Sequence, residues 1–231
     1  LKPVQLAGTT VKRATLHNAN EIERLDLHEG DSVYVEKGGE IIPKIINVNL
    51  EKRKADAKPI IYPSSCPECN TPLIRKEGEV AFYCPNDEAC PPQIVGKIQH
   101  FISRKAMNID GLGDETIEAF YQRKLVAHIS DLYTLHEKAD ELKTLERFGE
   151  KSIENMLKGI ELSKQMPFEK VLFGLGIRYV GETVARKLAF GTKSIDKLMT
   201  SSLEELTSID EIGQRIAERI IEYFSNPEHI Q

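Results

Sequence analysis

The stretch Ile-Asp-Gly-Leu-Gly at residues 109–113 decides the fold of more than half of this chain of 231 residues. Its last glycine recurs at intervals of 36, 32 and 32 residues, with apolar residues four before it, one before it and seven after it. The four glycines are Gly113, Gly149, Gly181 and Gly213, and their apolar frames are Ile109, Leu112 and Phe120, then Leu145, Phe148 and Met156, then Ile177, Val180 and Leu188, then Ile209, Ile212 and Ile220. Because glycine interrupts a helix, each copy predicts a helix, a tight turn and a second helix. The sequence therefore predicts an all-α region of four repeats.

Each of these turns resembles the helix-hairpin-helix motif of DNA-repair and ligation proteins. In that motif the backbone amides around apolar-x-Gly-apolar-Gly hold a backbone phosphate without reading base sequence. The first copy alone has both glycines, because Arg147, Tyr179 and Glu211 occupy the first-glycine slot in the other three. A helical repeat whose glycines serve only to make tight turns is the alternative.

The charge of the chain limits how it can hold nucleic acid. The net charge is −5, and residues 107–231 hold 16 basic and 22 acidic side chains. Bulk electrostatic attraction is therefore excluded as the main source of affinity in this region, and oriented amides with locally placed cations must supply it. The candidate contacts in the repeats are Gly111, Gly113, Gly149, Lys151, Arg178, Gly181, Gly213 and Arg215, with Arg186, Lys187 and Arg219 as further cations. Each cation also fits an ordinary solvated helix face.

The four cysteines of the chain form a second motif. Cys66 and Cys69 are separated by two residues, Cys84 follows after fourteen more, and Cys90 after another five. Thiolates are preferred zinc ligands, and two pairs joined by a hairpin around residues 76–79 predict a closed structural zinc site. Two disulfides or four free thiols are the alternatives. The sequence shows no signal peptide and no apolar segment long enough to span a membrane, which favours a reducing compartment and disfavours disulfides.

The first 60 residues have the sequence pattern of a small β-barrel. Alternating or β-branched runs predict strands at 4–11, 32–36 and 41–48, and helical spacing predicts a helix at 15–25. Turn signals between them fit a partly open barrel of the OB type, a fold that commonly lies along nucleic acid. The clusters Lys12-Arg13 and Lys52-Arg53-Lys54 suggest phosphate contacts there, and ordinary solubility explains them equally well. A barrel with a purely structural role is the alternative.

The glycine repeat, the cysteine motif and the strand pattern together predict three modules. Residues 1–62 form an all-β OB-like barrel, 63–92 a small four-cysteine zinc finger, and 93–231 an all-α domain of four helix-hairpin-helix repeats. Proline-bearing segments mark the boundaries, and Pro167 divides the repeats into two paired units.

The order of these modules resembles the C-terminal half of bacterial NAD-dependent DNA ligases, over essentially the whole chain. The strings that carry the resemblance, besides the cysteine spacing, are Lys-Pro-Val-Gln-Leu-Ala-Gly-Thr-Thr-Val at 2–11, Ala-Thr-Leu-His-Asn at 14–18, Glu-Ile-Ile-Pro at 40–43, Ala-Met-Asn-Ile-Asp-Gly-Leu-Gly at 106–113 and Phe-Gly-Leu-Gly-Ile-Arg-Tyr-Val-Gly at 173–181. The resemblance implies the DNA-binding clamp portion of an enzyme that seals single-strand nicks in duplex DNA during replication and repair. It also implies that Ile41 and Ile42 face the nick, with Glu40 where an aspartate is more usual.

The resemblance further implies what lies outside this sequence. Adenylation in the family uses the lysine of a Lys-x-Asp-Gly motif, and no such motif occurs in these 231 residues. NAD and Mg²⁺ would be bound mainly by other parts of the parent enzyme, whose N-terminal adenylation domain precedes the barrel. The absence of that domain and the start at Leu1 lead us to expect a fragment that is inactive alone and has no catalytic residue.

The expected partner is nicked duplex DNA, bound by a monomer in the bacterial cytoplasm in association with the nucleoid, with no membrane contact. Two other classes stay open from sequence. One is a non-catalytic helix-hairpin-helix factor of repair or recombination, which explains the barrel and the finger poorly. The other is a zinc-stabilised interaction scaffold that does not bind DNA, which suits the acidic repeats.

Overall fold

The computed structural model describes residues 1–231 except 7, 37–41, 146–147 and 231. The chain divides into two compact units, Leu1–Cys90 and Pro91–Gln231, and each is described by itself. In the described part of the chain, no helix is long and apolar enough to cross a membrane. The predicted module boundaries at residues 62 and 92 stay predictions.

The first unit begins with a hairpin rather than with one strand. β1 (Val4–Leu6) pairs antiparallel with β2 (Thr9–Val11). The prediction of a continuous strand over 4–11 was wrong because Gly8, at φ +74°, turns the chain back on itself. Glycine adopts this left-handed conformation without the steric cost that other residues incur.

A second hairpin and one short helix hold the small core of this unit. β3 (Val33–Glu36) pairs antiparallel with β4 (Lys44–Val48), and one parallel bridge joins Thr15 to Lys44. α1 (Ala19–Arg24) is shorter than the predicted helix, because Asn18 caps it by accepting a hydrogen bond from the Glu21 amide. The buried residues of this core are Ile22, Leu27 and Val48.

Arg53 belongs to the internal structure of this unit. It follows the 3₁₀ turn η1 (Leu50–Lys52), and its guanidinium forms two 3.0 Å hydrogen bonds to Asp31 and one of 2.6 Å to Asp26. The Asp31 side chain is only 2% exposed. Arg53 therefore ties η1 to the loop between α1 and β3, and the expectation that it contacts phosphate is corrected.

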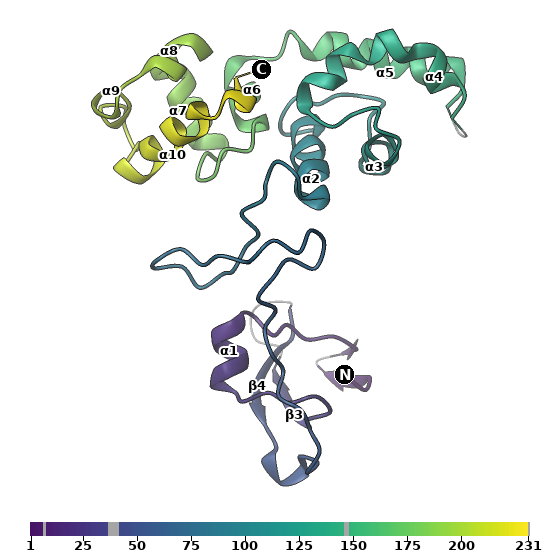
Figure 1. Ribbon diagram of the computed structural model, residues 1–231, viewed down its shortest axis with the longest axis vertical. Coiled ribbons are helices and arrows are strands. Elements are labelled where there is room, and N and C mark those ends of the chain that lie inside the picture. The colour runs from purple at the N-terminus through teal and green to yellow at the C-terminus, as the bar shows by residue number, and fades with distance from the viewer. Residues whose placement is uncertain (7, 37–41, 146–147, 231) are drawn as a thin grey trace. The chain divides into compact units, whose positions relative to one another are not determined.

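The second unit is entirely helical, as predicted (Figure 1). Its first half contains α2 (Pro91–Ile102), α3 (Asp114–Gln122), the 3₁₀ segment η2 (Ile129–Lys138), α4 (Ala139–Lys143) and α5 (Glu150–Ser163). Its second half contains α6 (Phe168–Gly174), α7 (Glu182–Thr192), α8 (Ile195–Thr200), α9 (Leu203–Thr207), α10 (Gln214–Ser225) and the 3₁₀ turn η3 (Pro227–His229).

The apolar frame read from the sequence forms two hydrophobic cores. One core includes Phe120 and Met156 from the first two repeats, and the other includes Leu188 and Ile220 from the last two. All twelve frame residues are buried or half-buried. The helices that follow the four glycines are therefore held by tertiary packing, while the number of repeats stays a prediction.

The two cores meet where α2 contacts α6. The His100 ring nitrogen Nε2 lies 2.8 Å from the Phe173 carbonyl oxygen, and the two rings pack edge to face. At Gly174, an added Cβ would lie 3.1 Å from the Phe101 ring, so a side chain there would require that ring to shift by a few tenths of an ångström. Pro167 begins α6 and ends the connection from α5, in the region where the sequence predicted a division.

Candidate metal centre and nucleic-acid interface

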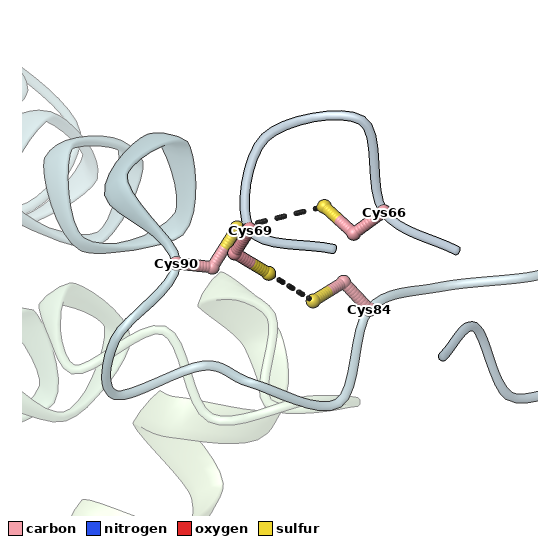
Figure 2. Close-up of side chains that lie close together, drawn as sticks. All are labelled: Cys66, Cys69, Cys84 and Cys90. Carbon is pink, nitrogen blue, oxygen red and sulfur yellow. Dashed lines mark hydrogen bonds between the residues drawn. The ribbon is translucent and has the colours of Figure 1, made fainter. Parts of the chain in front are cut away.

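The four cysteines converge on one point, with their sulfur atoms facing one another (Figure 2). The Sγ atoms of Cys66 and Cys90 are 3.8 Å apart, those of Cys69 and Cys84 are 3.4 Å apart, and all four lie within 4.8 Å of one another. A tetrahedral zinc ion bound at its usual Zn–S distance places sulfurs about 3.8 Å apart, whereas a disulfide needs about 2 Å. The cysteines are free thiols here, and their arrangement fits a four-coordinate zinc ion.

Two turns and a short hairpin position these ligands. The Asn70 amide donates to the Cys66 carbonyl, with Asn70 in the left-handed region at φ +57°, and this turn brings Cys66 and Cys69 together. The Cys90 amide donates to the Asn86 carbonyl. The bridge between Ile74 and Tyr83 confirms the predicted hairpin that joins the two cysteine pairs.

The electrostatics of the cluster also suit a metal. The Thr71 hydroxyl and backbone amide, with smaller contributions from Cys84 and Asn86, lower the pKa of the Cys69 thiol to about 6. Burial raises the pKa of the Cys84 thiol. Because zinc binds thiolates, a cysteine that is largely deprotonated at neutral pH favours metal entry, and the ion then drives deprotonation of its partners.

The four repeated glycines all stand immediately before a helix. Gly113, Gly149, Gly181 and Gly213 are the N-cap residues of α3, α5, α7 and α10, and none of these four helices has a side-chain cap. By contrast, the Ser194 and Ser202 side chains cap α8 and α9 by accepting hydrogen bonds from the Lys197 and Glu205 amides. A Cβ added to any of the four glycines would meet nothing within 4 Å. Each of these helix starts is therefore open to an incoming anion, since first-turn amides lack an intrahelical acceptor.

Gly111 differs from these four glycines in its packing, and its contact with phosphate stays a prediction. A Cβ on Gly111 would lie 2.9 Å from the Met156 Cα, and one on Gly159 would lie 2.3 Å from the Asp110 carbonyl oxygen. The first turn is thus packed against the backbone of α5. Sequence reasoning grouped Gly111 with the phosphate-contacting glycines and did not single out Gly159, a glycine inside a helix that is conspicuous only once the packing partner is known.

The first-glycine slot keeps its backbone conformation where the glycine is lost. Gly111 has φ +85°, and Tyr179 and Glu211 in the same slot have φ +71° and +62°. Arg147, which holds the slot in the second repeat, lies outside the described residues. The hairpin geometry therefore does not depend on glycine in the third and fourth repeats.

Some of the remaining candidate residues are exposed, and others form ion pairs within the protein. Lys151 is exposed in the first turn of α5, and Lys12 and Arg13 are exposed after β2. Lys187 pairs with both Asp210 and Glu211, and Arg219 pairs with Glu222. Ile42 is 63% exposed, whereas Ile41 and Glu40 lie outside the described residues.

Arg178 and Arg215 converge on Tyr179. The guanidinium carbons lie 5.1 Å and 4.3 Å from the centre of the tyrosine ring. Because Arg178 and Tyr179 belong to the third turn and Arg215 to the first turn of α10, this contact brings the third and fourth repeats together. Sequence reasoning marked Tyr179 only as a departure from glycine.

Comparison with protein families decides the relationship. Residues 1–57 match the NAD-dependent DNA ligase OB-fold domain, and residues 65–91 match the NAD-dependent DNA ligase C4 zinc finger domain. The chain belongs to the NAD-dependent DNA ligase family. Residues 170–231 also match a helix-hairpin-helix motif, which covers the third and fourth predicted repeats. The family resemblance, the fold class and the structural zinc site predicted from sequence are therefore confirmed.

Curated relatives of this chain agree with the family match. It is 62% identical over 231 residues to a DNA ligase of Cytophaga hutchinsonii, 59% over 229 to one of Phocaeicola vulgatus and 57% over 229 to one of Flavobacterium johnsoniae. These alignments cover 99% or more of this chain but 34% of each relative. The chain thus spans about a third of the length of the ligases it matches.

Proposed function

We propose that this chain is the DNA-binding clamp portion of an NAD-dependent DNA ligase that seals single-strand nicks in duplex DNA. The observation that carries the proposal is the set of four helices that begin at exposed glycines without a side-chain cap. Backbone amides at such helix starts can hold phosphate oxygens at fixed positions along a duplex. This mode of contact suits an acidic repeat region, because it depends on oriented dipoles rather than on net charge.

The substrate we propose is a nicked duplex held through its phosphate backbone. Gly113, Gly149, Gly181 and Gly213 provide open amides, and Lys151, Arg178 and Arg215 place cations beside them. In the first unit, Lys12, Arg13 and the exposed Ile42 are the candidate contacts. Few phosphate contacts give modest affinity that falls with rising salt.

The catalytic step belongs to the proposed parent enzyme rather than to this chain alone. NAD supplies the adenylate that activates the 5′-phosphate, with Mg²⁺, and the adenylated lysine lies in a Lys-x-Asp-Gly motif that these 231 residues do not contain. We therefore propose that the chain acts as a monomeric partner of an adenylation domain and forms no lysyl-AMP alone. Its cytoplasmic and nucleoid location stays a prediction.

The zinc ion has a structural role in this proposal. Cys66, Cys69, Cys84 and Cys90 would complete a four-sulfur shell with no position left for water. Arg75, on the finger hairpin, donates a 3.0 Å hydrogen bond to the Asn20 side chain of α1. Zinc binding would thus order the finger and hold its hairpin against the β module.

The test is a binding titration of the fragment on nicked and intact duplexes of one sequence, at two salt concentrations. We expect salt-sensitive binding that weakens in Gly113→Val, Gly181→Val and Gly213→Val, because the added side chains cover the amides without changing charge. Gly96→Val is the matched control, since Gly96 also has nothing within 4 Å of an added Cβ but lies inside α2. Gly111→Val is unsuitable, because it would collide with the backbone of α5. Undiminished binding by all three variants would contradict the proposal.

A further inference from the structure

Tyr179 holds an unusual backbone conformation in the turn of the third repeat. Its φ of +71° is in the left-handed region, which bulky residues rarely adopt. Ile177 and Val180 are 4% exposed and fix the turn from both sides, while Tyr179 is 36% exposed. Strained residues of this kind persist where the surroundings determine them, and they gather at functional positions.

The contacts of Tyr179 extend from its own turn to the next repeat. The Arg215 guanidinium lies over the tyrosine ring, 4.3 Å from its centre, and also donates a hydrogen bond to the tyrosine hydroxyl. The Arg178 guanidinium lies 5.1 Å from the centre of the same ring. Arg178 belongs to the third turn, and Arg215 is the second residue of α10 after Gly213. One aromatic side chain thus joins two cations from two hairpins.

Glu211 occupies the same slot in the fourth repeat with different contacts. Its φ of +62° matches that of Tyr179, but its carboxylate pairs with Lys187 at 2.7 Å. Lys187 also pairs with Asp210 at 2.8 Å, so one lysine offsets the two acids of the fourth turn. The two slots therefore share a backbone geometry and differ in what the side chain supports.

We propose that Tyr179 is a positioning residue for duplex binding, and this inference rests on the proposed function. Its ring and hydroxyl hold Arg178 and Arg215 against one platform, so that the third and fourth turns present two guanidiniums to one stretch of phosphate backbone. Cation–π contact and the hydroxyl restrict the freedom of both long side chains, which lowers the entropy lost on binding. A glycine in this slot, although typical of the motif, weakens DNA binding in this protein.

The experiment compares Tyr179→Gly with Glu211→Gly. Both place glycine in a left-handed slot of a hairpin turn, so both make the same backbone change. We expect Tyr179→Gly to weaken duplex binding about fivefold, from the strength of a cation–π contact at a partly exposed site. We expect Glu211→Gly to bind as well as wild type or more tightly, since it removes an acidic side chain. Thermal unfolding of both variants monitors the fold.

A double-mutant cycle with Arg215→Gln tests positioning directly. Arg215→Gln should weaken binding and reduce the slope of log affinity against log salt by about one phosphate contact. In the Arg215→Gln background, Tyr179→Gly should lose most of its effect, whereas additive effects would contradict positioning. Tyr179→Phe, which keeps the ring, should restore most of the affinity lost in Tyr179→Gly.

The outcomes separate this inference from the function on which it rests. If wild type binds duplex DNA but Tyr179→Gly binds equally well, the positioning role is overturned and the clamp proposal stands. If wild type binds no duplex even at low salt, the proposed function fails and this inference fails with it.

Discussion

Gly159 offers a sharp test of how the first two hairpins are packed. A Cβ at this position would lie 2.3 Å from the Asp110 carbonyl oxygen and 3.2 Å from the Asp110 backbone nitrogen. Observed Cβ contacts are essentially never shorter than 3.0 Å, so Gly159→Ala must move the turn at Asp110 away from α5 by several tenths of an ångström. The obstacle is backbone rather than a flexible side chain, so the strain cannot be relieved by a rotamer change.

The expected magnitude follows from two opposing effects. Overpacking of a rigid site costs about 1–3 kcal/mol. The change from glycine to alanine inside a helix returns up to about 1 kcal/mol. We expect Gly159→Ala to lower the free energy of unfolding by about 1–2 kcal/mol. The matched control is Gly96→Ala in α2, where nothing lies within 4 Å of the added Cβ, and it should raise the free energy of unfolding by about 0.5–1 kcal/mol.

Urea denaturation followed by far-ultraviolet circular dichroism measures both variants. Among the described residues, the second unit holds every α-helix except α1, so the signal reports chiefly on it. The two substitutions should shift the midpoint in opposite directions with an unchanged slope, because slope follows the surface exposed on unfolding. If Gly159→Ala stabilised the protein as much as Gly96→Ala, the close packing of α5 on the first turn would be refuted.

Three further predictions concern the first unit. Arg53→Met should destabilise the β module by about 3 kcal/mol in urea unfolding, because it removes the only cation paired with the buried Asp31 carboxylate in the described structure, and Lys54→Met should be nearly neutral. Burial alone would raise the pKa of Asp31, but the Arg53 guanidinium and the His28 amide hold it below its usual value. The stabilisation from this carboxylate should therefore be complete above about pH 4 and be lost as the pH falls further, which acid unfolding of wild type against Arg53→Met would show. Chelation of zinc should expose four reactive thiols and speed hydrogen exchange in residues 63–90, while the helical circular dichroism signal persists. Native protein that contains no zinc and has four reactive thiols would contradict the metal site.

Much of the helical unit could be predicted because glycine and apolar periodicity act locally. The glycines fix where α3, α5, α7 and α10 begin, and the frame residues identify the buried faces. The cysteine cluster could be predicted for a similar reason, since ligand spacing and a short hairpin suffice to bring four sulfurs together.

The departures from prediction have two sources, a local glycine turn and tertiary contacts. The run 4–11 alternates like one strand, but the left-handed Gly8 makes it a hairpin. Arg53 lies in a short basic cluster that suggests contact with phosphate, yet its guanidinium is hydrogen-bonded to two aspartates of the α1–β3 loop. The packing of Gly111 against the α5 backbone was not predicted, although its contact with phosphate stays a prediction. The contacts of Arg53 and Gly111 join residues far apart in the sequence, so the local pattern does not show them.

The hairpin turns show that a motif's backbone conformation can persist while the residue in one position, and its contacts, change. Tyr179 and Glu211 keep the left-handed conformation of the first-glycine slot, although each incurs a steric cost that glycine avoids. The buried residues around each turn determine the conformation, which frees the slot for a side chain. In the third repeat that side chain supports two arginines, and in the fourth it pairs with Lys187. Departures from a binding signature, when the geometry is retained, can therefore indicate a second layer of contacts rather than loss of the site.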